Sequence, residues 1–166
     1  MRLNLGCGAR KIEGFHNVDS EAACSPDAVV DLEVFPWPWA DNSVTEVMLN
    51  HVLEHLGQET EVYLQIIKEI YRVCRHDSKV HIRVPHPRHD NFLSDPTHVR
   101  PITLKGLSMF SAAKCRLWQA AGAANTPLAL YMDVDFELVN YENRLDPKWQ
   151  SLFDNGLPEE ELQMAM

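Results

Sequence analysis

Leu3-Asn4-Leu5-Gly6-Cys7-Gly8 opens the chain as a short apolar run that ends in a glycine turn. Glycines at such a turn let the backbone approach a ligand closely and adopt positive φ. Four later runs, at 15–19, 28–32, 44–49 and 80–84, are also short, apolar and bounded by polar residues. Runs of this kind are typical of buried strands in a parallel sheet.

Two segments of the chain are predicted to be helical. Residues 60–74 carry apolar side chains at helical spacing, and residues 104–118 are predicted to form a second helix. Residues 131–141 are predicted to form the last strand. Alternating strands and helices indicate an α/β domain around a mostly parallel sheet. Only six residues separate Gly8 from Phe15, so the first helix is cut to about one turn or lost.

Size and charge limit the class of protein. The 166 residues, 45% of them hydrophobic, suit one domain over 1–166, with a core over 1–141 and a peripheral acidic tail over 142–166. A formal net charge of −9 repels phosphate backbones, so we expect no nucleic-acid partner. The sequence shows no membrane span and no signal peptide, and its four cysteines are scattered, so we predict a cytoplasmic protein.

Asp19 ends the second predicted strand and can accept hydrogen bonds from both hydroxyls of a ribose. The third glycine of a dinucleotide fingerprint is absent, however. No proper helix N-terminus remains to hold a pyrophosphate, which argues against NAD.

Five motifs, in this order and spacing, resemble class I S-adenosylmethionine-dependent methyltransferases, and most closely the branch called methyltransferase type 11. They are L-N-L-G-C-G (3–8), N-V-D (17–19), D-L-E (31–33), P-W-A-D-N-S-V (38–44) and H-V-L-E-H-L (51–56). The resemblance covers roughly residues 1–113. It implies a Rossmann-like three-layer sandwich with a mostly parallel sheet of six to seven strands and a reduced first helix.

The resemblance also implies S-adenosylmethionine as the cofactor. Residues 6–8 would line its methionine portion, and Asp19 would hold the ribose hydroxyls. Residues 31–32 would meet the adenine, while residues 50–51 would close over the sulfonium. The implied cofactor-binding residues are Asn4, Gly6, Cys7, Gly8, Asp19, Asp31, Leu32, Asn50 and His51.

Three features depart from the family pattern. Asn4 stands where many members carry an acid, which weakens contact with the ammonium group of the cofactor. The shortened first helix leaves the glycine loop less supported. Arg75-His76-Asp77-Ser78 stands where the family usually shows Pro-Gly-Gly.

Residues 86–103 form a long segment without periodicity, rich in His, Asp, Asn and Pro. Loops of this length in compact domains tend to be functional. A histidine can act as a general base near pH 7, so His89 and His98 are the candidate catalytic residues. We expect residues 86–100 to form a lid that orders when ligand binds. The competing interpretation is that residues 95–98 form a rigid structural turn.

The sequence leaves three functions open. The favoured one is methyl transfer from S-adenosylmethionine to a small-molecule or glycan acceptor. A second is a non-catalytic domain of the same fold that binds a nucleoside ligand or a partner. A third, less favoured, is a zinc hydrolase, because residues 51–55 match H-x-x-E-H, and a helix would bring His51, Glu54 and His55 together. That pattern explains none of the other motifs, so we expect no bound metal.

Overall fold

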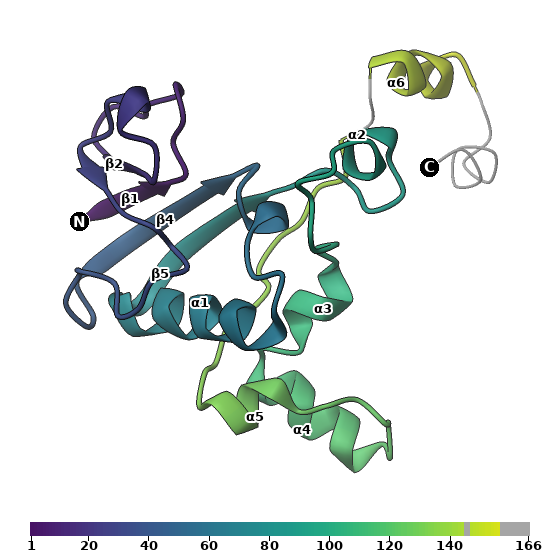
Figure 1. Cartoon of the computed structure of the whole chain (residues 1–166). Coiled ribbons are helices and arrows are strands. Elements are labelled where there is room, and N and C mark those ends of the chain that lie inside the picture. Colours follow the sequence, from purple (N-terminus) through teal and green to yellow (C-terminus); the bar gives the residue numbers. More distant parts are fainter. Residues whose placement is uncertain (145–146, 157–166) are drawn as a thin grey trace.

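The computed structural model describes residues 1–144 and 147–156 (Figure 1). Within them, five strands form one parallel sheet in the order β3-β2-β1-β4-β5. The strands are β1 (Arg2–Leu5), β2 (His16–Asp19), β3 (Ala28–Val29), β4 (Val44–Asn50) and β5 (Cys74–Arg83). The 3₁₀ turns are η1 (Ala22–Cys24) and η2 (Leu53–His55). The helices are α1 (Thr60–Val73), α2 (Asp90–Leu93), α3 (Leu104–Ser108), α4 (Ala112–Ala120), α5 (Leu128–Met132) and α6 (Pro147–Asp154).

The sheet of the described residues has five strands, so the predicted count of six to seven is wrong. The strand predicted over 131–141 is also wrong, because α5 covers its start and residues 133–141 join no sheet. Val134 is buried, and the Phe136 N–H donates to the Phe110 carbonyl at 2.9 Å. Only part of this segment packs against the helices, because Leu138, Val139 and Tyr141 are exposed. Part of the predicted acidic tail, at 145–146 and 157–166, lies outside the described residues.

Helix α1 confirms the helix predicted over 60–74, ending one residue earlier. The helix predicted over 104–118 is divided into α3 and α4. Ser111 interrupts it, because its side chain caps α4 by accepting a hydrogen bond from the Lys114 N–H. A single periodic pattern therefore covers two short helices.

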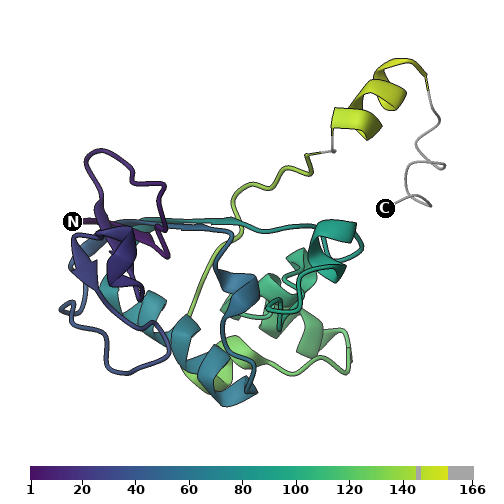
Figure 2. The same ribbon diagram turned by 45° about the horizontal axis from the view of Figure 1, so that its top comes forward.

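The helices α1, α3, α4 and α5 lie on the same face of the sheet (Figure 2). The predicted α/β architecture around a parallel sheet is confirmed, and within the described residues a helical layer covers this face of the sheet only. The connection from β1 to β2 holds only turns, closed by hydrogen bonds from the Arg10 N–H to the Cys7 carbonyl and from the Phe15 N–H to the Ile12 carbonyl. This confirms that the first helix is lost. The connection from β2 to β3 contains only η1, which is too short to cover a sheet.

The opposite face of the sheet is polar. On β5 the side chains of Lys79, His81 and Arg83 are exposed, while the intervening residues are half-buried. Glu46 on β4 accepts from Arg2 at 2.8 Å and lies 3.1 Å from a ring nitrogen of His81. Alternation of this kind belongs to a sheet with one solvated face.

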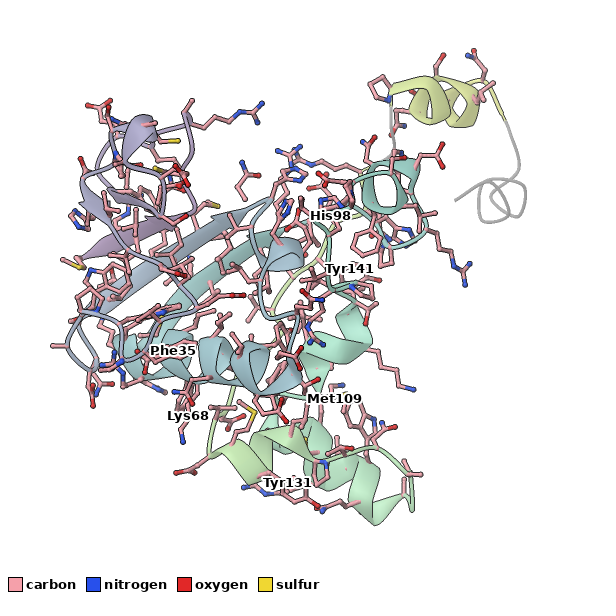
Figure 3. The ribbon with its side chains drawn as sticks, viewed as in Figure 1. Phe35, Lys68, His98, Met109, Tyr131 and Tyr141 are labelled. Atoms are coloured by element: carbon pink, nitrogen blue, oxygen red, sulfur yellow. The ribbon has the colours of Figure 1, made fainter. Side chains whose placement is uncertain are left out.

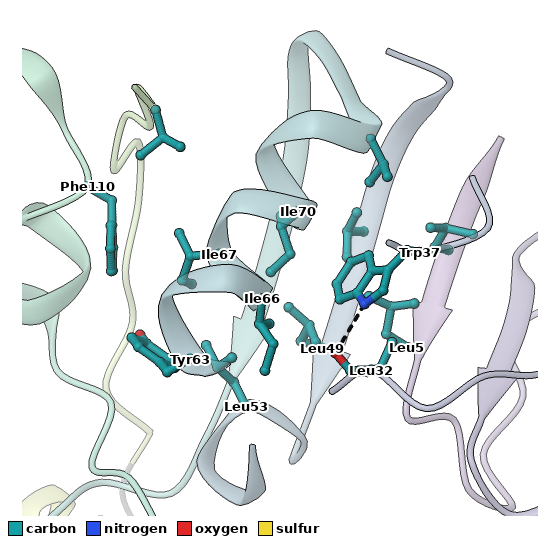
Figure 4. Packing of buried hydrophobic residues seen from close by; sticks show 14 of the residues in the cluster. Leu5, Leu32, Trp37, Leu49, Leu53, Tyr63, Ile66, Ile67, Ile70 and Phe110 are labelled. Carbon is teal, nitrogen blue, oxygen red and sulfur yellow. Dashed lines mark hydrogen bonds between the residues drawn. The ribbon is translucent and has the colours of Figure 1, made fainter. Parts of the chain in front are cut away.

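The core lies between the sheet and α1 (Figure 4). Helix α1 buries a stripe at helical spacing that includes Tyr63, Ile66 and Ile70, and these side chains pack with buried residues of β1 and β4. Trp37 closes one end of the core, and its indole Nε1–H donates to the Leu32 carbonyl at 3.1 Å.

A buried ion pair connects α1 to the segment before β4. The Glu69 carboxylate accepts from Arg72 Nε and Nη2, both at 2.7 Å, and from the Trp37 N–H at 2.7 Å. Arg72 also donates to the carbonyls of Trp37 and Trp39 and to Asp41. The hydrogen bonds from Arg72 and from Trp37 hold the pKa of Glu69 below its ordinary value. The pair thereby fixes residues 37–41 against α1.

Within residues 1–144 and 147–156, the helices are too short or too polar to cross a bilayer.

Candidate functional site

The carboxyl ends of β1, β2 and β4 meet at one edge of the sheet. Leu5 of β1 is paired with Val18 of β2 and with Leu49 of β4. The residues that follow these partners therefore lie side by side, which is the edge where open parallel sheets bind ligands. The register brings together the glycine loop, Asp19 and Asn50, as predicted from the sequence.

The two glycines of the loop, Gly6 and Gly8, have different surroundings. Gly6 has φ +64°, and a Cβ there would lie 2.5 Å from a methyl group of Val52. Gly8 has φ +49°, and a Cβ there would have nothing within 4 Å. Gly6 thus packs against the turn after β4, whereas Gly8 borders open space beside the sheet edge.

Asp19 supports the loop and keeps acceptor capacity. Its Oδ2 accepts from the Gly8 N–H at 2.7 Å, and its Oδ1 accepts from the Glu21 N–H at 3.0 Å. Each carboxylate oxygen has two lone pairs, so both can accept a further hydrogen bond from a hydroxyl. The predicted ribose contact is compatible with this geometry.

Asn4 and Cys7 face the interior. The Asn4 side chain is buried and donates to the Arg10 carbonyl at 3.1 Å and to Asn17 Oδ1 at 2.9 Å. Asn17 Oδ1 also accepts from the Ile12 N–H at 2.8 Å. These two asparagines hold the loop that replaces the first helix. Cys7 is buried as well, and burial raises the pKa of its thiol.

Asp31 and Leu32, which are predicted to contact the adenine, differ in exposure. Asp31 is exposed and lies beyond the short strand β3, with Oδ1 accepting from the Glu33 N–H. Leu32 is buried, and its carbonyl accepts from Trp37. This hydrogen bond uses one lone pair of the carbonyl, so the second lone pair and the N–H group of Leu32 remain for the predicted backbone contact with adenine.

Asn50 and His51 follow β4. The Asn50 Oδ1 atom is buried and has no hydrogen-bond partner among the described residues. His51 has φ +56°, and its half-exposed imidazole lies with Nδ1 3.3 Å from Glu54 Oε1. The helix required by the zinc-peptidase alternative is not formed, because η2 covers only Leu53–His55 and His51 lies outside it.

The second half of the long segment is anchored to η2. The Glu54 carbonyl accepts from the N–H groups of Val99 and Arg100 at 2.9 and 3.2 Å. The Arg100 guanidinium donates to the Gly57 carbonyl at 2.7 Å and lies over the Tyr63 ring. We call residues 95–102 the anchored turn, because these hydrogen bonds fix them to η2 and the residues after it. Only residues 86–94 remain candidates for the predicted lid.

The two candidate catalytic histidines, His89 and His98, make different contacts. His89 caps α2, since its Nδ1 accepts from the Asn91 N–H at 3.0 Å. His98 lies beside α2 (Figure 3), with its ring centroid 4.6 Å from that of His55. The sequence analysis did not place His98 near His55. The D-P-T-H run at 95–98 was the available signal, because Asp before Pro favours a turn.

We expect the two halves of this segment to differ in protease sensitivity. Residues 95–102 are held by backbone and arginine hydrogen bonds to η2, whereas Leu93 in the first half is 68% exposed. Limited proteolysis of the ligand-free protein with a broad-specificity protease should cut within 86–94 first. Earlier cleavage within 95–102, located by mass spectrometry, would contradict the anchored turn.

A cavity of about 210 Å³ lies between α1 and helices α3 and α5. Its walls include Tyr63, Arg100, Thr103 and Phe110, and burial raises the pKa of Tyr63 to about 12. None of the predicted cofactor-binding or catalytic residues lines it.

The architecture has a counterpart among solved structures. The crystal structure of a SAM-dependent methyltransferase from Archaeoglobus fulgidus superposes with a TM-score of 0.56, covering 92% of this chain and 75% of that chain. The chain has a methyltransferase fold. The two sequences are 19% identical, so the likeness is one of fold. No protein-family model matches the chain, and no curated protein matches it.

Proposed function

We propose that the protein binds S-adenosylmethionine at the carboxyl edge of β1, β2 and β4 and transfers its methyl group to an acceptor. The observation that carries this proposal is the open space beside Gly8, bordered by the Asp19 carboxylate. The residues Asn50 and His51 border the same edge. The shared fold with a SAM-dependent methyltransferase supports the same conclusion.

The chemistry requires few groups from the protein. Methyl transfer is an in-line displacement at a sulfonium, so holding donor and acceptor in register supplies much of the rate. In this proposal residues 6–8 hold the methionine portion and Asp19 holds the ribose. In the same proposal, Asp31 and the backbone of Leu32 contact the adenine. The acceptor is a small molecule or a glycan, in keeping with the acidic net charge of −9.

We expect Asp19→Ala to weaken S-adenosylmethionine binding by at least about 100-fold. The change removes two charge-assisted hydrogen bonds to the ribose, each worth about 1.5–3 kcal/mol. Isothermal titration calorimetry with S-adenosylmethionine and S-adenosylhomocysteine measures the loss. Glu13→Ala is the matched control, because Glu13 is an exposed acid in the neighbouring loop and its loss changes the net charge equally.

Two results would contradict this proposal. One is the absence of binding heat with either ligand in a folded wild-type protein. The other is equal affinity in the Asp19→Ala and Glu13→Ala variants. Binding of both ligands without release of S-adenosylhomocysteine across a panel of hydroxyl and amine acceptors would favour the non-catalytic alternative.

A further inference from the structure

A buried carboxylate without a hydrogen-bond partner lies in the turn that follows β4. The Glu54 side chain is 0% exposed, and neither of its oxygens accepts a hydrogen bond from the described residues. The basic group His51 is within reach, with Nδ1 3.3 Å from Oε1. Burying a charge is costly unless the charge is paired and hydrogen-bonded, so this carboxylate requires a strong positive partner.

Two further side chains converge on this carboxylate. Glu54, His55 and His98 each offer one ligand atom, and the three atoms lie within 4.8 Å of one another. Zinc ligands lie about 2 Å from the ion, so small rotations of these side chains would close them around one cation. His98 comes from 43 residues further along the chain than His55, and the anchored turn at 95–102 brings it there.

The hydrogen bonds of both imidazoles leave the same nitrogen free. His98 Nδ1 lies 2.9 Å from the Phe92 carbonyl, which can only accept, so Nδ1 carries the proton. His55 Nδ1 lies 2.9 Å from Thr97 Oγ1, whose own proton goes to Asp95 Oδ1 at 2.6 Å. His55 Nδ1 therefore also donates.

In both rings the lone pair is then on Nε2. Metal-binding histidines are oriented in this way, with the other ring N–H donated to a carbonyl or toward a carboxylate. Asp95 ends the chain of donors from His55, and the Thr97 hydroxyl and N–H hold its pKa below the usual value. Its second oxygen, Oδ2, lies 3.8 Å from His98 Nε2, so a second acidic group is near the same point.

We propose that Glu54, His55 and His98 bind a divalent transition-metal ion, with zinc as the first candidate. Two imidazoles and one carboxylate form a donor set that catalytic zinc uses with a fourth position left open. From sequence we expect no metal, because H-x-x-E-H explains none of the other motifs, and the zinc alternative in that pattern uses His51 with Glu54 and His55. The tertiary structure replaces His51 with His98 in that set.

The position of the site gives the ion a chemical use. Glu54 lies four residues beyond Asn50, at the same edge of the sheet as the glycine loop. A bound divalent ion lowers the pKa of a water molecule or hydroxyl group that binds at its open position. The metal site itself rests on Glu54, His55 and His98 and does not depend on binding of a methyl donor.

The test uses the full-length, tag-free protein after chelation and dialysis. Calorimetric titration with zinc chloride, together with elemental analysis, should find one zinc ion per chain, and the melting temperature should rise. Cobalt(II) should produce the visible absorption of a low-coordinate site. Each of Glu54→Gln and His98→Ala should weaken zinc binding by at least about 100-fold. Thr97→Val should weaken it by about 10- to 100-fold, because Thr97 orients His55 and is not itself a ligand.

His76→Ala is the matched control, because the His76 side chain is 96% exposed and should leave zinc affinity unchanged. Thr97→Val nearly preserves side-chain shape, so it keeps the test valid if His98→Ala fails to fold. A folded wild-type protein that binds no zinc would overturn the proposal. Zinc affinity unchanged in both Glu54→Gln and Thr97→Val would overturn it as well, by assigning the metal to other groups.

Discussion

Replacing Arg72 with methionine is expected to lower the free energy of unfolding by about 3–5 kcal/mol. The substitution keeps most of the apolar stem but leaves the Glu69 carboxylate, 4% exposed, without its bidentate partner. It also removes the donors that hold the carbonyls of Trp37 and Trp39. An uncompensated buried charge and a released segment before β4 act in the same direction.

Urea unfolding followed by circular dichroism measures this loss. Arg75→Met is the matched control, since Arg75 is exposed in the first part of β5 and the same charge is removed. A difference between the two variants of less than about 1 kcal/mol, the size of a surface ion pair, would contradict the role assigned to Arg72.

The same pair predicts a pH dependence. Because the pKa of Glu69 is lowered in the folded state, its contribution is present above the unfolded value of about 4.5 and is lost as pH falls through the folded value. Acidification below about pH 4.5 should therefore destabilise the wild type more than Glu69→Gln. Parallel stability curves for the two proteins between pH 6 and the acid transition would contradict this assignment.

Replacing Gly6 with alanine is expected to cost about 2–5 kcal/mol of stability. The left-handed backbone conformation contributes about 1–2 kcal/mol for a residue with a Cβ, and overpacking contributes about 1–3 kcal/mol. The overpacking arises because the new Cβ would lie 2.5 Å and 2.9 Å from the two methyl groups of Val52. The loop or the turn after β4 has to shift, and both border the proposed cofactor site.

A double-mutant cycle with Val52→Ala separates the two causes. The truncated residue 52 makes room for the new Cβ, so Gly6→Ala should cost only the backbone strain in that background. Gly8→Ala is the second comparison, because φ there is also positive while the surrounding space is empty. Gly8→Ala should lower the free energy of unfolding by about 1–2 kcal/mol. Its loss of binding free energy for S-adenosylmethionine should be larger than that. Additive effects of Gly6→Ala and Val52→Ala would contradict the packing argument.

The short strands and helix α1 could be predicted from the sequence because their signals are local. The stripe that includes Tyr63, Ile66 and Ile70 has helical spacing, and each of the first strands ends at a polar or glycine residue. The sequence indicated a first helix of about one turn or none, because only six residues separate Gly8 from Phe15.

The last predicted strand failed for a different reason. The apolar residues at 131–141 fit a strand by local pattern, but in the structure Val134 packs against the helices while Val139 and Tyr141 are exposed. Residues distant in the sequence decide this outcome. The Leu32 carbonyl accepts from an indole five residues away, and that contact depends on how Trp37 enters the core.

The sequence by itself determined which strands form and which polar groups follow them, because chain connectivity and the register of a parallel sheet carry Gly6, Asp19 and Asn50 to one edge. Only the tertiary structure decided that His98 meets His55 and Glu54. That meeting depends on two hydrogen bonds to the Glu54 carbonyl and on the Arg100 guanidinium at Gly57, between segments more than 40 residues apart. Local sequence cannot encode such contacts, since their free energy is realised only when both segments are already packed on the same sheet.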